Sequence, residues 1–407
     1  MGTLPTKEMD FERLVEHFDH YDFELAQDPH PRYRYLRERC PLARSDQHDG
    51  FWVVSTYEDV HTVMSDSETY STKTLIIPEQ EIGLPFPVSQ TDPPEHAEWR
   101  AIIQPWFSAG RAAKSEASVR QRTNELIDEF VERGACDLAL ELAYKLPADV
   151  IADLMGVPRE DEAMFRDCAN RVGDTSIDDP EGAGAAFQEL FEYYGKLLDL
   201  RRHEPRDDIP TALVNATVEG RPLTYEELVM LCIIIQLAGF ATTAGFMANV
   251  LWHVAEHPEH RQRLLDEPSV IPRAVEEYLR ALAPTSVGRR VARDTVLRDT
   301  PLKQGDRLIL LLGSANRDDH VFPNADVIDF DRSPNRHVTF GQSIHRCVGM
   351  HLARLESKVM LEEVLLRIPD FHVTPGAKPR LAVGHNWGVR SLAVTFSPGQ
   401  RLASPMG

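Results

Sequence analysis

The run FGQSIHRCVG, residues 340–349, decides how this chain is interpreted, because it places one cysteine just before a helix-forming stretch. A helix start offers unpaired backbone N–H groups and a partial positive charge, which favour the anionic, metal-binding form of cysteine over the neutral thiol. Cys347 is therefore a candidate metal ligand. The competing interpretation is that Cys347, like most isolated intracellular cysteines, is a small buried apolar residue.

Composition excludes several classes of protein. The 407 residues carry 44 Lys and Arg against 64 Asp and Glu, and the formal net charge of −20 would repel nucleic acid and anionic membranes. The five cysteines show neither a disulfide framework nor zinc-binding spacing, which fits a reducing compartment. Because the N-terminus shows no signal-peptide pattern, we expect a cytoplasmic protein with no nucleic-acid or membrane partner.

One uncharged stretch, residues 228–252, is long enough to span a bilayer. Gln236, Thr242 and Asn249 interrupt it and no second span follows, so we interpret it as a helix buried in a soluble protein. Thr224 and Glu227 form a capping box at its start, and a Pro at 258 closes it after about 30 residues, or roughly 45 Å.

The remaining pattern predicts a mainly α fold with a minor β region. Helical periodicity dominates residues 117–280, whereas short strand-like runs occur at 51–56, 307–312 and 391–396. Residues 315–346 are rich in Asn, Asp, Pro and Arg without periodicity, which is typical of a functional or disordered loop. We predict a single domain over residues 1–407, with residues 1–28 as a loosely ordered extension.

Small side chains form a stripe along the long helix. Ala238, Ala241, Thr242 and Gly245 follow the spacing i, i+3, i+4, i+7. Such a face allows close approach of either another helix or a planar cofactor, and the spacing alone leaves both open.

Two charged pairs are weak signals individually. Glu277 and Arg280 in EYLR share a helix face at i, i+3, and His96 and Arg100 in HAEWR share one at i, i+4. Solvated pairs at these spacings are common, so neither indicates a site without further support.

Together and in this order, these motifs resemble the cytochrome P450 family, over about residues 29–396. The resemblance implies the P450 fold, with the long helix crossing a heme b whose iron is bound by the Cys347 thiolate. It assigns oxygen handling to Thr242, with Ala241 and Thr243 beside it, and implies a monooxygenase, an oxidoreductase that uses O2. Glu277, Arg280 and Arg332 match a structural triad of the family.

The resemblance also implies which residues contact the heme. Its carboxylates need cationic or N–H donors in a partly dry site. Arg289 and Arg290 are adjacent, and either could contact a heme carboxylate; we predict that Arg290 does. The implied heme contacts are His96, Arg100, Ala238, Arg290, Phe340, His345, Cys347 and Gly349.

Two residues depart from the family pattern. Ser343 replaces a usual glycine of the cysteine loop, so the turn must either avoid φ > 0 or strain this serine. Ala241 replaces the acid that usually precedes Thr242 and relays protons during oxygen activation. Three alternatives remain open. Thr242 with ordered water could relay the protons, the substrate could contribute a polar group, or the reaction could be peroxide-driven or non-hydroxylating.

Family position implies mostly apolar walls for the substrate, and hence a small apolar or aromatic molecule. The loop before HAEWR also carries Ile82 and Leu84. The predicted pocket residues are Ile76, Ile77, Phe86, Gln236, Phe240, Ser286, Val287 and Trp387.

Electrons must come from a separate protein, because no dinucleotide-binding or flavin motif is present. We expect NAD(P)H to supply them through a ferredoxin or flavodoxin with its reductase, and we expect a monomer. A basic surface on the cysteine side of the heme would suit such an acidic partner. Its predicted residues are Arg100, Arg111, Lys114, Arg120, Arg346 and Arg354.

A protein of another class would bind heme without turnover, as a carrier or sensor. The apolar pocket residues are compatible with that alternative. Thr242 argues against it, since a pure binder needs no hydroxyl at the oxygen position.

Overall fold

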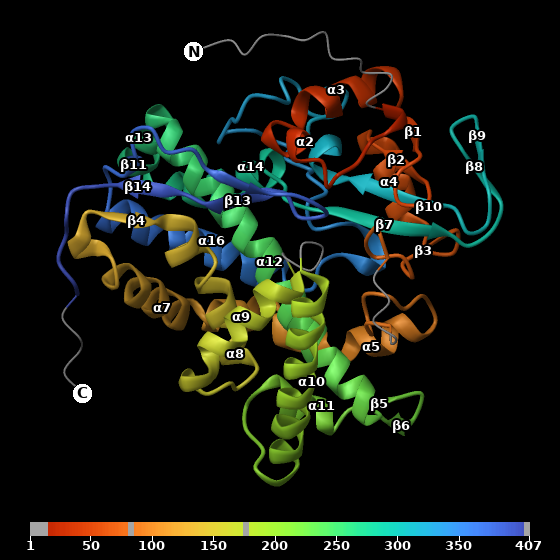
Figure 1. The fold of residues 1–407 in the computed structure, drawn as a ribbon, viewed down its shortest axis with the longest axis horizontal. Helices are drawn as coiled ribbons and strands as arrows, with labels where there is room; N and C mark the ends of the chain where they lie inside the picture. Colours follow the sequence, from red (N-terminus) through yellow and green to blue (C-terminus); the bar gives the residue numbers. More distant parts are fainter. Residues whose placement is uncertain (1–14, 80–84, 174–178, 403–407) are drawn as a thin grey trace.

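Helices dominate the computed structural model, which describes residues 15–79, 85–173 and 179–402 (Figure 1). Their bounds are α2 (Phe23–Gln27), α3 (His30–Arg39), α4 (Tyr57–Ser65), α5 (Glu95–Ile103), α6 (Ala109–Lys114), α7 (Glu116–Asp128), α8 (Leu146–Leu154), α9 (Glu162–Gly173), α10 (Pro180–His203), α11 (Ile209–Val214), α12 (Tyr225–Glu256), α13 (Pro258–Asp266), α14 (Ile271–Ala281), α15 (Leu312–Ala315) and α16 (Met350–Arg367).

The largest sheet lies beside the N-terminal helices. Its strands follow the order β1 (Leu42–Ser45), β2 (Phe51–Val54), β10 (Arg307–Leu311), β7 (Ser286–Val291) and β3 (Tyr70–Ser71). Strand β10 runs parallel to β2, and the other neighbours are antiparallel. The predicted runs at 51–56 and 307–312 correspond to β2 and β10, and the prediction of a mainly α fold with a minor β region is confirmed.

Smaller sheets complete the β structure. A three-stranded sheet joins β11 (His372–Val373), β14 (Ala393–Thr395) and β4 (Ala135–Asp137). The two-stranded ribbons are β12 (Arg380–Ala382) with β13 (Gly388–Ser391), β5 (Thr217–Val218) with β6 (Arg221–Pro222), and β8 (Thr295–Leu297) with β9 (Thr300–Leu302).

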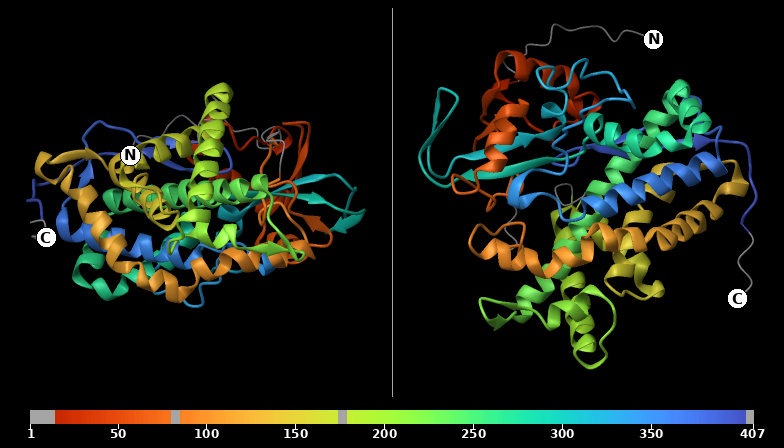
Figure 2. Two further views of the ribbon diagram at one scale, coloured as in Figure 1. Left: turned by 90° about the horizontal axis from the view of Figure 1, so that it is seen from below. Right: turned by 180° about the vertical axis from the view of Figure 1, so that it is seen from behind.

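Helix α12 crosses the middle of the molecule, as Figures 1 and 2 show. The Thr224 side chain accepts a hydrogen bond from the Glu227 N–H while the Glu227 carboxylate accepts one from the Thr224 N–H, so the predicted capping box is present. Among the described residues it is the helix long and apolar enough to cross a membrane, and 78% of its most apolar window is buried. Neighbouring helices α8, α9, α10 and α16 cover it.

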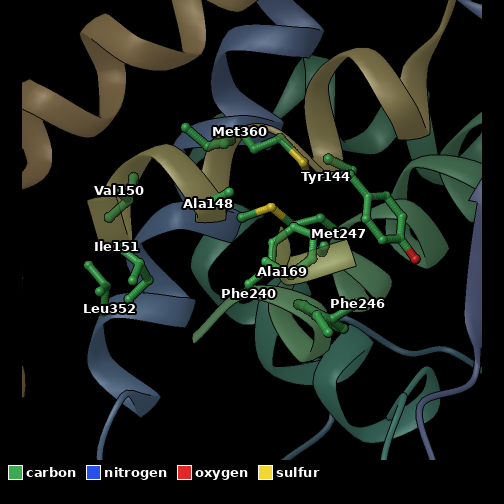
Figure 3. Close-up of a cluster of buried hydrophobic side chains, with 14 of the residues drawn as sticks. Tyr144, Ala148, Val150, Ile151, Ala169, Phe240, Phe246, Met247, Leu352 and Met360 are labelled. Atoms are coloured by element: carbon green, nitrogen blue, oxygen red, sulfur yellow. The ribbon is translucent and has the colours of Figure 1, made fainter. Parts of the chain in front are cut away.

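The main core joins α8, α12 and α16. Figure 3 shows Phe240 and Met247 of α12 packed with Ile151 of α8 and with Leu352 and Met360 of α16. Because α16 begins directly after the cysteine loop, this packing fixes the position of that loop relative to α12.

Part of the predicted N-terminal extension packs against the rest of the fold. Phe18 is fully buried and lies in a cluster with Leu36, Phe51 and Leu311. Residues 1–14 of that extension lie outside the described residues.

Candidate active site

Cys347 lies in a tight loop between the 3-10 turn Ser343–His345 and α16. Its backbone N–H donates to the Phe340 carbonyl at 2.7 Å, which folds the loop back on itself. Ser343 has φ = +58°, the left-handed conformation that an L side chain rarely adopts, as does Gly341 at +68°. The loop therefore keeps its turn and strains the serine rather than avoiding φ > 0.

Several groups around Cys347 favour its thiolate form, whereas burial favours the neutral thiol. The Gly349 N–H and the guanidinium groups of Arg100, Arg354 and Arg346 favour the anion. Cys347 retains exposed surface, yet desolvation by the surrounding protein atoms is larger and raises the pKa of its thiol. The predicted thiolate-favouring groups are thus present around Cys347, and burial of the thiol opposes them.

His345 and His96 meet beside the cysteine loop, from the 3-10 turn and from α5. Their ring centroids lie 4.1 Å apart, and the Nε2 atom of each is buried without a hydrogen-bond partner among the residues that the structure describes. Burial, with His96 and Arg289 nearby, lowers the pKa of His345 to about 3. Burial, followed by the charge of Arg100, also lowers the pKa of His96. Each imidazole therefore presents a buried ring nitrogen that can hydrogen-bond to a ligand, as a donor when that nitrogen carries the proton.

Arg289 rather than Arg290 faces this group. Arg290 is 40% exposed, and its guanidinium pairs with Glu79 while its Nε donates to Thr74. Arg289 is only 6% exposed and lies close enough to His345 to lower its pKa. Adjacent residues of a strand point to opposite faces, so only one can reach the site. The choice of Arg290 is corrected to Arg289.

The Arg289 guanidinium forms no ion pair within the described part of the chain. Its Nη1 donates to the Gly288 carbonyl at 2.7 Å, and burial lowers its pKa to about 10. Arg100 is partly buried on α5, and burial lowers its pKa as well. A buried guanidinium without an anion is costly, so these cations fit a site that receives an anionic group.

Sequence reasoning missed Asp92, which supports this corner. Its carboxylate accepts from the Thr72 N–H at 3.0 Å and from the Ser71 hydroxyl, and its carbonyl accepts from the His96 N–H. Asp92 therefore ties β3 to the start of α5. The signal was an Asp just before Pro-Pro at a helix start, which is a typical position for a residue that organises a helix N-terminus.

Opposite the loop, α12 leaves part of its small-residue stripe uncovered. Ala238 is exposed and Thr242 partly buried, although the flanking turns of the helix are buried. The other half of the stripe is covered, because Gly388 of β13 packs closely against the Gly245 backbone. The covered half therefore packs against a strand rather than against another helix, and the uncovered half leaves the planar-cofactor interpretation open.

Thr242 forms a hydrogen bond within its own helix. Its hydroxyl donates to the Ala238 carbonyl at 3.0 Å, and Ala241 and Thr243 beside it are buried. The proton on Thr242 Oγ1 is therefore held by the backbone, while the oxygen lone pairs remain free to accept.

The structure brings Glu277, Arg280 and Arg332 together. Arg280 donates to Glu277 from Nε at 2.9 Å and from Nη2 at 2.7 Å, and Arg332 Nε donates to Glu277 at 3.0 Å. Both arginines also donate to the Val327 carbonyl, in the irregular segment before the cysteine loop. Arg280 and Glu277 are almost fully buried, so this network acts as a scaffold for that segment.

Several predicted pocket residues have other partners. Gln236 accepts from Tyr194 at 3.0 Å and donates to the Phe165 carbonyl at 3.1 Å, so neither of its polar atoms is available to a ligand. Phe240 is fully buried against Tyr144, as Figure 3 shows. The predictions of Gln236 and Phe240 as pocket residues are wrong, because both turn toward neighbouring helices.

Ile77, Ser286 and Trp387 also point elsewhere. Ile77 is 1% exposed within the N-terminal cluster. The Ser286 side chain bonds to Tyr33, and the Trp387 indole N–H donates to the Ala26 carbonyl at 2.7 Å. These three predictions are corrected, since their side chains anchor the N-terminal helices.

Other predicted pocket residues keep compatible positions. Val287 shares a strand face with Arg289, and Ile76 is partly buried. Phe86 is buried. Phe340 and Gly349, two of the predicted heme contacts, lie in the cysteine loop. Ile82 and Leu84 lie outside the described residues.

The predicted basic surface is mostly neutralised by acids. Arg111 pairs with Asp207 at 2.7 Å, Arg120 is surrounded by carboxylates, and Arg354 pairs with Glu276. Lys114 and Arg346 are exposed and form no ion pair among the residues that the structure describes. The predicted six-residue patch is therefore corrected to a much smaller one.

Comparisons with known proteins agree with the resemblance. The family model for cytochrome P450 matches residues 180–389. The mycinamicin IV hydroxylase/epoxidase of Micromonospora griseorubida is 34% identical over 385 residues, which cover 92% of this chain and 93% of the relative. The steroid C26-monooxygenase of Mycolicibacterium smegmatis is 32% identical over 373 residues, 90% of this chain and 92% of that protein.

Solved structures give the same result. The crystal structure of CYP109E1 from Bacillus megaterium in complex with testosterone has a TM-score of 0.85 and 31% identity, covering 92% of this chain and 99% of the other. The polyketide synthase cytochrome P450 PksS of Bacillus subtilis has a TM-score of 0.86 and 29% identity, covering 93% of this chain and 100% of the other.

Proposed function

Because the chain belongs to the cytochrome P450 family of heme-thiolate monooxygenases, we propose that it inserts one atom of O2 into an apolar or aromatic molecule, with Cys347 as the iron ligand of a heme b. The chain is an oxidoreductase. One observation carries the assignment of the site: two buried imidazole nitrogens without a hydrogen-bond partner among the described residues, His96 Nε2 and His345 Nε2, gather beside the cysteine loop with Arg289, which has no ion pair there.

The residues present fit a heme. His96 Nε2, His345 Nε2 and the guanidinium groups of Arg289 and Arg100 would hold its two carboxylates through charge-assisted hydrogen bonds. Cys347 would bind the iron from one side, and the uncovered face at Ala238 and Thr242 would admit the flat ring from the other. When bound, this group supplies the redox-active iron that activates O2.

On this side of the site, proton handling falls to Thr242. Its Oγ1 accepts through free lone pairs, and its proton leaves the Ala238 carbonyl only when the hydroxyl rotates. Ala241 offers no titratable group, so a proton must reach Thr242 from water or from the substrate.

Ala241 also supports a second candidate, a peroxide-driven or non-hydroxylating reaction such as coupling or dehydrogenation. Turnover with NAD(P)H and a ferredoxin system, compared with turnover driven by peroxide, separates the two. Product formed only with peroxide would exclude the O2-dependent reaction.

The substrate we propose is apolar, because Ile76, Phe86 and Val287 would supply apolar walls. Relatives act on mycinamicin IV and on a steroid, and a structural neighbour holds testosterone, so macrolides and steroids belong in the screen beside small aromatic and terpenoid compounds. Substrate binding to the heme-loaded protein would be followed by the change in its absorbance spectrum.

We propose a separate ferredoxin or flavodoxin as electron donor, in a cytoplasmic, monomeric protein without nucleic-acid or membrane partners. The free charges of Arg346 and Lys114 support docking of an acidic partner on the cysteine side. Arg346→Glu should then slow reduction by ferredoxin without changing peroxide-driven turnover, whereas equal rates for wild type and variant would exclude docking there.

Thiolate ligation is tested directly by reducing the purified protein, adding carbon monoxide and recording the Soret band. The wild type should show the red-shifted band of a thiolate-ligated heme, and Cys347→Ala should lose it. Cys40→Ala is a matched control, since Cys40 is also free and not fully buried. A wild-type band typical of an imidazole-ligated heme would reject the proposal.

A further inference from the structure

Three histidines meet where α12 ends and α13 begins, away from the site described above. His253 lies in the last turn of α12, His257 caps that helix, and His260 lies in the first turn of α13. One possible ligand atom of each lies within 4.8 Å of the other two. His253 follows Thr242 by eleven residues, about 16 Å along the helix, so the cluster is distinct from the cysteine site.

The backbone and the core hold these imidazoles in place. The His257 N–H donates to the His253 carbonyl at 2.9 Å, and the His260 N–H donates to the His257 carbonyl at 3.1 Å. The buried rings of Tyr278 and Phe330 pack against His253 and His260, with centroids 5.4 and 5.1 Å away. The three side chains are therefore arranged before any ligand arrives, which lowers the entropic cost of binding one.

The three imidazoles lie in contact with one another. His253 Nε2 and His260 Nδ1 lie 2.7 Å apart, and the rings of His253 and His257 stack with centroids 4.0 Å apart. Neutral imidazole is the form that binds transition metals.

Charged groups around the cluster both favour and oppose the binding of a cation. Glu259 Oε1 lies 3.1 Å from His257 Nδ1, and a carboxylate in that position orients an imidazole and favours a nearby cation. Arg317 acts on His253 and Arg263 on His260 as positive charges. Arg263 is itself paired with Asp331 at 2.5 Å, which reduces its effect.

We propose that His253, His257 and His260 bind one divalent transition-metal ion, and that zinc is the ion best suited to three imidazoles. Zinc–nitrogen distances of about 2.0–2.1 Å in a tetrahedron place the nitrogens about 3.3 Å apart. The His253–His260 pair, now at 2.7 Å, must open by roughly 0.6 Å, and the rings of the three histidines, which are nearly parallel, must rotate so that their nitrogens converge on one point. The exposed His257 leaves room for water as a fourth ligand. The ion would fasten the last turn of α12 to α13 across the His257–Pro258 junction.

The test uses the heme-loaded protein, stripped of loose metal with a chelator and then desalted. Isothermal titration with Zn²⁺ and metal analysis should give one ion per chain, and Zn²⁺ should raise the melting temperature. His257→Gln, at an exposed position, should weaken zinc binding by about tenfold or more and abolish that thermal shift. His320→Gln removes an exposed histidine elsewhere and should behave like the wild type.

Two results would overturn the proposal. The wild type could bind no zinc, which would make the cluster a hydrogen-bonded histidine group only, or His257→Gln could bind zinc as tightly as the wild type. The Soret band is the internal control: it should be unchanged by Zn²⁺ and by both substitutions, and a zinc-induced change would assign the ion to the heme region instead.

Discussion

Replacing Arg289 with methionine should weaken heme binding, whereas the same replacement at Arg290 should not. The two residues are adjacent on β7. Arg289 is 6% exposed and lies near His345, whereas Arg290 is 40% exposed and pairs with Glu79. Comparing the two variants therefore distinguishes the effect of losing a buried cation at the site from the effect of losing a surface ion pair.

The size of the effect follows from these environments. A hydrogen bond to a charged group contributes about 1.5–3 kcal/mol, so Arg289→Met should lower heme affinity by about 10- to 150-fold. Arg290→Met loses an exposed ion pair worth at most about 1 kcal/mol of folding stability and should leave heme affinity unchanged. Without heme, Arg289 is a buried charge that lacks an anion among the described residues, so Arg289→Met should not destabilise the heme-free protein.

The assay is transfer of heme from each variant to an excess of a high-affinity heme-binding apoprotein, followed at the Soret band. Urea unfolding of the heme-free variants measures whether either substitution changes the folding stability. Faster heme loss from Arg290→Met than from Arg289→Met would refute the assignment of the two strand faces. Wild-type rates in both variants would refute a carboxylate contact by either arginine.

Three further predictions concern stability. Ser343→Gly should stabilise the protein by about 0.5–1 kcal/mol and leave the Soret band unchanged, because glycine adopts φ = +58° without strain; a lower urea midpoint would contradict this. Glu277→Gln should cost about 3–5 kcal/mol in urea unfolding, because it leaves the fully buried Arg280 without its counter-charge; a loss below about 1 kcal/mol would mean that the carbonyl contacts suffice. Burial raises the pKa of Glu356 from 4.5 to about 8, so the folded chain keeps a proton that the unfolded chain releases, and stability should fall as pH rises between these values. The slopes of wild type and Glu356→Gln should differ by about 1.4 kcal/mol per pH unit in this range, because buried histidines contribute equally to both; equal slopes would exclude this carboxyl as a contributor.

The sequence determined the features that depend on local pattern and order. The capping box at Thr224 and the uncharged run after it specified α12, because both follow from residues close together in the chain. The family pattern around Cys347 and the order of His96, Glu277, Arg280 and Arg332 gave the class of protein.

Directions of side chains depended on tertiary packing. The register of β7 between β10 and β3 decides whether Arg289 or Arg290 faces the site. The alternation of a strand already places Val287 and Arg289 on the same face, and this could have been used to predict Arg289. Gln236 and Phe240 lie on the predicted helix, but only the positions of Tyr194 and Tyr144 decide that they turn into the core.

Charge is the clearest case of what only the tertiary structure decided. Composition gave the net charge of −20, and family position gave six basic residues on one side. Their neutralisation depends on acids far away in the chain, such as Asp207 beside Arg111 and Glu276 beside Arg354. The sequence by itself thus determined the fold class and the cysteine loop, since these rest on short-range pattern. The tertiary structure decided which donors stay unpaired, because pairing depends on contacts between distant segments.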